Sequence, residues 1–170
     1  MTKKRILMSG AGSGFGELAA IGLAKAGHDV IVGAQIWPQV REGHGVQLFK
    51  SYRKDIPDGG QKRDFVYVRD AADVIAWLMQ NPQVNGIFNL GSGAARTFED
   101  MAVAVFQAAG QEPRIEYTPM PPAIRDKYQY FTQARMDRLV AAGYPKPMTP
   151  LEEGIEDYVV RYLSQPDPYR

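Results

Sequence analysis

Hydrophobic and polar positions follow two periods along this chain, and its first 33 residues contain both. An apolar run of strand length at residues 5–8 precedes a glycine-rich loop, and apolar residues then recur at helical spacing over residues 17–26. Residues 29–33 (DVIVG) form a second apolar run, which is too short for a helix and rich in β-branched side chains. The pattern predicts a strand, a glycine loop, a helix and a second strand.

The next stretch, from Gln35 to Gly60, lacks a clear period, and its glycine and proline turn signals predict irregular structure. Regular patterns return after it. Thr97 and Asp100 have the spacing of a helix capping box, and Thr149 followed by Pro150 predicts the start of the last helix. The strands expected here are 64–68, 86–91 and 114–117, and the helices are 70–81, 97–109, 132–142 and 151–163.

Bulk composition narrows the class of protein. The chain has 170 residues, 45% of them hydrophobic, and a net charge of +1, which is typical of one ordinary globular domain without a strong electrostatic field. Nucleic-acid binding through a basic face is therefore not expected, and Lys3-Lys4-Arg5 is interpreted as a solvated strand flank.

Metal and thiol chemistry also find little support in the sequence. The chain has no cysteine and two histidines, His28 and His44, so neither a disulfide framework nor a histidine metal site is expected. Because no apolar run approaches the ~18 residues of a membrane span and no signal-peptide pattern precedes the first strand, we expect a cytoplasmic protein that binds no membrane.

The glycine loop is the first candidate site. In a strand–loop–helix unit, loop glycines let the backbone approach a pyrophosphate, and the helix N-terminus offers unpaired N–H groups to the anion. A fortuitous turn is the alternative, and the flanking strands and helix favour dinucleotide binding. Gly10, Gly14 and Gly16 fit Gly-x-x-x-Gly-x-Gly, which resembles the cofactor loop of the short-chain dehydrogenases. The residues expected to bind the cofactor are Gly10, Ala11, Gly12, Ser13, Gly14, Phe15, Gly16 and Gln35.

The end of the second predicted strand bears on the choice of nicotinamide. An acidic residue there would bind the ribose hydroxyls of NAD, whereas a nearby arginine would receive the 2′-phosphate of NADP. This chain has Gly33-Ala34-Gln35 at that place. The missing carboxylate favours NADP, and NAD remains the alternative.

The rest of the chain carries a more extended resemblance. Its motifs are "REGHG" (41–45), "KRDFVYVRDAADV" (62–74), "GIFNLGSGAARTFEDMA" (86–102), "KYQYFTQARMDRLVAAGY" (127–144) and "KPMTPLEEGIEDYV" (146–159). Together they resemble the C-terminal half of the ADP-glyceromanno-heptose 6-epimerases, which are extended short-chain dehydrogenases of the NAD-dependent epimerase/dehydratase family.

The resemblance implies an α/β fold: an abridged Rossmann-like NAD(P)-binding fold joined to the substrate-binding part of an extended short-chain dehydrogenase. We expect residues 1–40 to form the dinucleotide-binding β-α-β segment and residues 41–170 the epimerase-like segment, packed as one domain. The implied activity is NADP-dependent epimerisation of a nucleotide sugar, ADP-heptose, for lipopolysaccharide core precursors.

The same resemblance assigns substrate contacts. Residues of two motifs and of the stretch after Val46 match positions where the family contacts the sugar nucleotide. The alternatives without substrate contact are a surface charge for Arg63, a solvated side chain for Lys50 and an interface aromatic for Tyr128. The matching residues are Phe49, Lys50, Ser51, Tyr52, Arg63 and Tyr128.

The chain departs from the family where the chemistry is expected. The family uses a Tyr-x-x-x-Lys pair as base, yet no tyrosine here has lysine four positions later, and Gly45 follows His44 where the family has lysine. We therefore assign no catalytic residue. The glycine spacing also belongs to the single-domain branch of the superfamily, which points to a fusion, an internal deletion or a remnant.

Three functions are thus carried forward: a catalytically impaired epimerase-like protein, a non-catalytic binding remnant, or a compact short-chain oxidoreductase. Missing sheet strands would leave open edges, which self-association could cover.

The remaining motifs are interpreted as structural. Asp70 and Asp73 favour a helix N-terminus, residues 90–93 (LGSG) form a connecting turn, and the core candidates are Trp77, Leu78, Met101 and Phe106.

Overall fold

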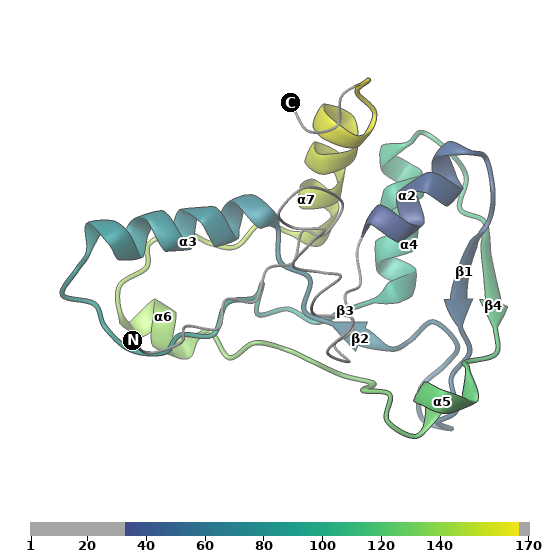
Figure 1. Ribbon diagram of the computed structural model, residues 1–170, viewed down its shortest axis with the longest axis horizontal. Coiled ribbons are helices and arrows are strands. Elements are labelled where there is room, and N and C mark those ends of the chain that lie inside the picture. Colours follow the sequence, from purple (N-terminus) through teal and green to yellow (C-terminus); the bar gives the residue numbers. More distant parts are fainter. Residues whose placement is uncertain (1–32, 167–170) are drawn as a thin grey trace.

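The computed structural model describes residues 33–166; the predicted strand at 5–8, the glycine loop, the helix at 17–26 and residues 29–32 of the second strand lie outside these residues. The described chain is a mixture of helices and short strands (Figure 1). Its helices are α2 (Gly33–Arg41), α3 (Val68–Gln80), α4 (Phe98–Ala108), α5 (Pro122–Arg125), α6 (Asp137–Ala141), α7 (Leu151–Tyr158) and a π-helical turn, η1 (Val159–Leu163). Its strands are β1 (Val46–Phe49), β2 (Lys62–Arg63), β3 (Arg96–Thr97) and β4 (Ile115–Thr118).

Two helix–strand units, α2–β1 and α4–β4, run side by side in the same direction. Strand β1 pairs in parallel with β4, with Val46 opposite Ile115. At the ends of the two helices, the Gln111 amide donates to the Val40 carbonyl at 3.1 Å. The helices pack through a core that also receives α7 (Figure 1). Its buried side chains include Ile36, Trp37, Val40, Met101, Val105 and Phe106.

A second core lies under α3 and α6, at the other side of the molecule (Figure 1). Val74 of α3, Leu139 of α6 and Tyr144 are buried there, and Phe88 and Leu90 pack against them. Trp77 stacks edge-on against Tyr144 at 5.5 Å between ring centroids. The core roles predicted for Trp77 and Leu78 are confirmed here, as are those of Met101 and Phe106 in the first core.

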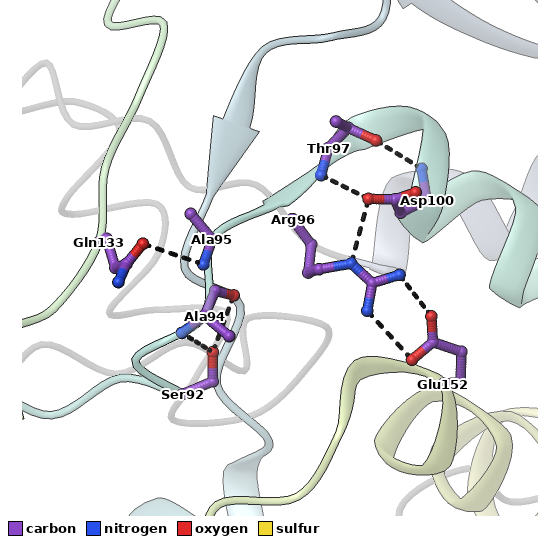
Figure 2. Close-up of polar contacts among 8 residues, drawn as sticks. All are labelled: Ser92, Ala94, Ala95, Arg96, Thr97, Asp100, Gln133 and Glu152. Atoms are coloured by element: carbon purple, nitrogen blue, oxygen red, sulfur yellow. Dashed lines mark hydrogen bonds and ion pairs between the residues drawn. The ribbon is translucent and has the colours of Figure 1, made fainter.

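The predicted helix start at Thr97 is confirmed, capping box included. The Thr97 hydroxyl accepts from the Asp100 backbone N–H, and the Asp100 carboxylate accepts from the Thr97 N–H, each at 2.9 Å. Arg96 donates to both Asp100 and Glu152 of α7 (Figure 2). Burial alone would raise the pKa of Asp100, but hydrogen bonds from Thr97 and Arg96 outweigh it and lower that pKa. The junction of β3 with α4 is thus tied to α7.

Irregular structure over residues 35–60 was the wrong expectation for two parts of that range. Residues 33–41 form α2, in spite of Pro38 inside the helix, and residues 46–49 form β1. Ile36, Trp37 and Val40 bury one face of α2, and this burial outweighs the turn signal of Trp37-Pro38. Gly43, at φ +78°, ends the helix as a glycine in the left-handed region should.

Two predicted strands are also corrected. Residues 64–67 form no ladder, so the strand is confined to Lys62–Arg63, and helix α3 already begins at Val68. Residues 86–91 pair with no strand among the described residues. In residues 86–90 the alternation of apolar residues reflects burial on one side, and a strand also needs a neighbouring backbone.

The predicted helix 132–142 is shorter than expected. Only Asp137–Ala141 is helical, because the preceding backbone bonds elsewhere: Thr132 N–H donates to the Lys62 carbonyl at 3.3 Å. Thr149 is also not the cap of α7. Pro150 holds that position, and the Thr149 hydroxyl donates to buried Asp70 at 2.7 Å. The helix 70–81 and the strand 114–117 are confirmed within two residues as α3 and β4.

Candidate functional site

The candidate site begins where β1 ends, at Phe49. The buried side chain of Gln61, which is only 1% exposed, contacts the chain where it leaves this strand. The Gln61 side-chain amide donates to the Phe49 and Lys50 carbonyls, each at 3.3 Å. A buried amide with these two bonds fixes the direction in which the chain leaves β1.

Arg63 of β2 lies at the centre of the site. Its guanidinium carbon stands 5.2 Å from the Tyr128 ring centroid and 5.6 Å from that of Phe98. Its Nη1 donates to the Lys62 carbonyl at 2.9 Å. Phe49 meets the Tyr128 ring edge-on at 6.3 Å. The structure therefore brings together three of the predicted substrate-binding residues, Phe49, Arg63 and Tyr128.

A second group of rings and cations continues from this centre. Tyr130 stacks edge-on against Tyr128 at 5.7 Å, and its hydroxyl accepts from the Tyr52 backbone N–H at 2.9 Å. The Arg125 guanidinium lies 3.9 Å from the Tyr52 ring centroid, close enough for a cation–π contact. We name these side chains the aromatic–arginine cluster: Phe49, Tyr52, Arg53, Arg63, Arg125, Tyr128 and Tyr130.

The other two predicted contacts, Lys50 and Ser51, occupy the loop beside this cluster. The Lys50 side chain is exposed. Ser51 is used by the loop itself: its N–H donates to the Asp58 carboxylate at 2.6 Å, and its hydroxyl donates to the Arg53 carbonyl at 3.1 Å. Lys50 is thus accessible from solvent, whereas the bonds of Ser51 shape the loop.

Four residues of the site escaped sequence reasoning: Arg53, Gln61, Arg125 and Tyr130. The sequence does contain an indication for Tyr130. Residues two apart in an extended chain face the same side, and Tyr128 is a predicted substrate contact. Arg125 comes from the Pro-rich bend, where α5 forms, and joins the cluster only through the fold. Nothing in the local sequence marks Gln61 as buried.

The predicted turn at residues 90–93 is confirmed as structural by the partner that it holds. The Asp64 carboxylate accepts from the Ser92 N–H at 2.6 Å, from the Ser92 hydroxyl at 2.6 Å and from the Gly93 N–H at 3.0 Å. Because the Ser92 and Gly93 N–H groups already donate to this carboxylate, the loop has a structural role. Gly91 leaves room for it, since a Cβ there would lie 2.5 Å from an Asp64 oxygen.

Asp70 and Asp73 are structural, as the sequence indicated. Asp70 holds Thr149, and Asp73 pairs with Lys146 at 2.7 Å. His44 is exposed beside Glu42. Over residues 33–166 no group of three or more acidic, histidine or cysteine side chains is arranged to hold a metal ion. In the same range, no helix is both long enough and apolar enough to cross a membrane.

Of the residues predicted to bind the cofactor, the structure describes Gln35 alone. Gly10–Gly16 lie outside the described residues, and Gln35 belongs to α2, so the expected position at the end of a strand is corrected to the first turns of a helix.

The fold is that of the Rossmann-like extended short-chain dehydrogenases, a class that includes sugar-nucleotide epimerases. The structure is similar to a Thermus thermophilus UDP-glucose 4-epimerase in complex with NAD, with TM-score 0.57 and 29% identity over 76% of this chain and 40% of that one. It is also similar to the Helicobacter pylori ADP-L-glycero-D-manno-heptose-6-epimerase, with TM-score 0.55 and 25% identity over 74% of this chain and 35% of that one.

Sequence comparison agrees. Residues 19–91 match the NAD dependent epimerase/dehydratase family. An ADP-L-glycero-D-manno-heptose-6-epimerase of Nitratidesulfovibrio vulgaris (strain DP4) is 50% identical over 133 residues, which are 78% of this chain and 41% of that protein. The chain therefore carries an NAD-dependent epimerase/dehydratase family segment, and it spans less than half the length of this relative.

Proposed function

We propose that this chain is an ADP-glyceromanno-heptose 6-epimerase-like protein that binds a nucleotide sugar at the aromatic–arginine cluster and NADP at residues 10–16. The names of the relatives at 50% and 25% identity support the ADP-heptose substrate class. In this proposal the chain serves lipopolysaccharide precursor synthesis in the cytoplasm, with NAD as the alternative cofactor. When bound, the nicotinamide would carry the hydride of the epimerisation.

The observation that carries the nucleotide-sugar site is the position of Arg63 within cation–π distance of the Tyr128 and Phe98 rings, with Tyr128 also in contact with Phe49 at the end of β1. A guanidinium offers paired donors that match a phosphate, and stacking on rings holds its plane in place. Aromatic rings such as Tyr52, partly exposed, give a nucleotide base a face for stacking. Rings and cations together therefore suit a ligand with a base and a diphosphate.

The test is calorimetric titration with ADP. We expect Arg63→Ala to weaken binding by about 1.5–3 kcal/mol, or about 10- to 150-fold, because a charged hydrogen bond to the phosphate is lost. The matched control is Arg135→Ala, since Arg135 is an exposed arginine whose partner is exposed Asp137. Equal ADP affinity of the Arg63→Ala variant and the unmodified chain would assign Arg63 to packing alone.

The cofactor proposal rests on the order strand, glycine loop, helix and second strand in the sequence. We expect Gly14→Val to abolish NADP binding, because a side chain at that position would block the approach of the pyrophosphate to the backbone. Titrations of the unmodified chain and this variant with NADP and NAD measure this and give the preference between them. Failure of the unmodified chain to bind either one at millimolar concentration would contradict the proposal.

A second candidate function is a binding remnant that holds these ligands without turnover. The absence of a Tyr-x-x-x-Lys pair from the sequence favours it over full activity. A compact short-chain oxidoreductase is disfavoured for the same reason, since it would use the same pair. Turnover assays separate these candidates from an active epimerase.

A further inference from the structure

Helix α3 has two apolar stripes and lies along an outer edge of the molecule (Figure 1). One stripe is covered: Val74 is 3% exposed in the second core, and Trp77 and Leu78 pack beside it. An outer helix ordinarily has polar residues on its remaining surface, yet α3 exposes a second row of apolar side chains. We name this row the α3 stripe: Val68, Ala72, Ile75 and Met79.

Exposure and spacing of the α3 stripe point to a second helix as its occupant. Val68 is 45% exposed, Ile75 49% and Met79 78%. The intervals between the four members are four, three and four residues, which is the spacing of the a and d positions of a heptad repeat. A seam of this width is covered by one helix lying alongside it.

The α3 stripe is complementary to a second copy of itself in the antiparallel direction. With a two-fold axis between residues 73 and 74, Val68 of one copy lies opposite Met79 of the other, and Ala72 lies opposite Ile75. Each layer then pairs a smaller side chain with a larger one, so the two rows interdigitate. In a parallel pair identical residues would meet, and two Ala72 side chains would leave a gap. The antiparallel pair is isologous, which is the commonest form of a two-fold dimer.

Charges beside the α3 stripe agree with this occupant. The guanidinium of Arg69 contacts Asp157 and the Tyr162 hydroxyl, and the side chain is still 55% exposed. In the antiparallel pair Arg69 would lie beside the last turn of the other α3, which has no basic residue. The C-terminal end of a helix is the negative end of its dipole, so a cation is favourable there. We propose that two copies of this chain form a two-fold dimer in which their α3 stripes pack together antiparallel.

Sedimentation equilibrium of the full chain measures this association. One helix pair about 20 Å long makes a contact smaller than a standard protein interface. We therefore expect a monomer–dimer equilibrium with a dissociation constant of about 1–100 µM. A chain that stays monomeric over the range from about 1 to 500 µM, which brackets this constant, would overturn the proposal.

Ile75→Lys tests whether α3 makes the contact. The new ammonium group would face an apolar side chain of the other copy, so the dissociation constant should rise at least about tenfold. Val160→Lys is the matched control, because Val160 of η1 is 48% exposed and lies outside the α3 stripe. It should leave the association unchanged, and circular dichroism checks that both variants are folded. Association that survives Ile75→Lys would place the contact elsewhere and overturn the proposal.

A pair of complementary variants tests the antiparallel direction. Ala72→Glu alone should also weaken the association. In a mixed dimer of Ala72→Glu with Ile75→Lys, one layer joins the new carboxylate to the new ammonium group, and the symmetry-related layer keeps the unmodified pair. We therefore expect the mixture to associate at least about tenfold more tightly than either variant alone. Equal association of the mixture and the separate variants would show that residues 72 and 75 do not meet, which overturns the proposal.

The α3 stripe shares no residue with the aromatic–arginine cluster. We expect calorimetric titration of Ile75→Lys with ADP to give the affinity of the unmodified chain, so the dimer proposal and the nucleotide-sugar proposal succeed or fail separately.

Discussion

Asp64 shows how much of this fold can depend on one carboxylate. It joins three segments that are distant in sequence, since it accepts from Ser92 and Gly93 in one loop and from the Ala134 N–H at 2.8 Å in another. A carboxylate has acceptor sites for all of these donors, and an amide in its place would lose one oxygen and add donors with no acceptor.

We therefore expect Asp64→Asn to lower the free energy of unfolding by about 1.5–3 kcal/mol, the range for losing hydrogen bonds to a charged group. Urea denaturation followed by circular dichroism measures it. Asp126→Asn is the control, because Asp126 is exposed just after α5 and should change stability by less than about 0.5 kcal/mol. Equal midpoints for the two variants would remove Asp64 from its joining role.

At the scale of elements, polar contacts join α7 and η1 to Tyr67 and to the first turn of α3. The Tyr67 hydroxyl donates to Asp157, and Arg161 pairs with the same carboxylate at 2.7 Å. Arg69 donates to the Tyr162 hydroxyl at 2.8 Å. Burial raises the pKa of Tyr67 above its ordinary value, and the hydrogen bond to Asp157 raises it further.

This contact predicts a particular dependence on pH. The protonated phenol is favoured in the folded state, so its contribution to stability is complete below the unfolded pKa, near 10, and is lost as the pH rises above 10 toward the higher folded pKa. We expect Tyr67→Phe to lower stability by about 1 kcal/mol at pH 7 and to make the alkaline decline above pH 10 shallower. Denaturation at pH 7 to 11 measures both.

Tyr52→Phe serves as the matched control for that series. Tyr52 is 46% exposed, so its hydroxyl should matter little to stability. An alkaline decline of the same steepness in Tyr67→Phe and in the unmodified chain would show that the Tyr67 phenol does not contribute.

At the scale of the whole molecule, the sequence lacks the proton-transfer pair that the family resemblance leads us to expect. We expect no epimerase turnover above background, because general acid–base catalysis contributes about 10²–10⁴-fold and both the Tyr-x-x-x-Lys pair and the lysine after His44 are missing from the sequence. A second copy could not restore them, since every copy lacks the same residues.

The measurement is conversion of ADP-D-glycero-heptose to its L-glycero epimer by purified protein with added NADP. The Arg63→Ala variant controls for background in the preparation. Robust turnover that disappears when one of the nine tyrosines is replaced would identify a base other than the expected one.

Local signals in the sequence were sufficient where an element depends on its own residues. Periodicity predicts α3 and α4, and the capping box fixes the start of α4 at Thr97, because both effects act within a few residues of chain. The family motifs predict that Phe49, Arg63 and Tyr128 share a site, and the structure brings these three side chains together.

Tertiary structure decided what depends on a distant partner. Residues 33–41 are helical because α4 buries one face of them, and residues 130–132 are extended because Lys62 bonds their backbone. Gln61 and Asp64 become positioning residues only once distant loops surround them. Residues 86–90 depend on a partner in the same way. Their alternation predicts a strand, yet they pair with no strand among the described residues. A ladder forms only when a second backbone lies alongside, so the sequence of one segment does not determine it.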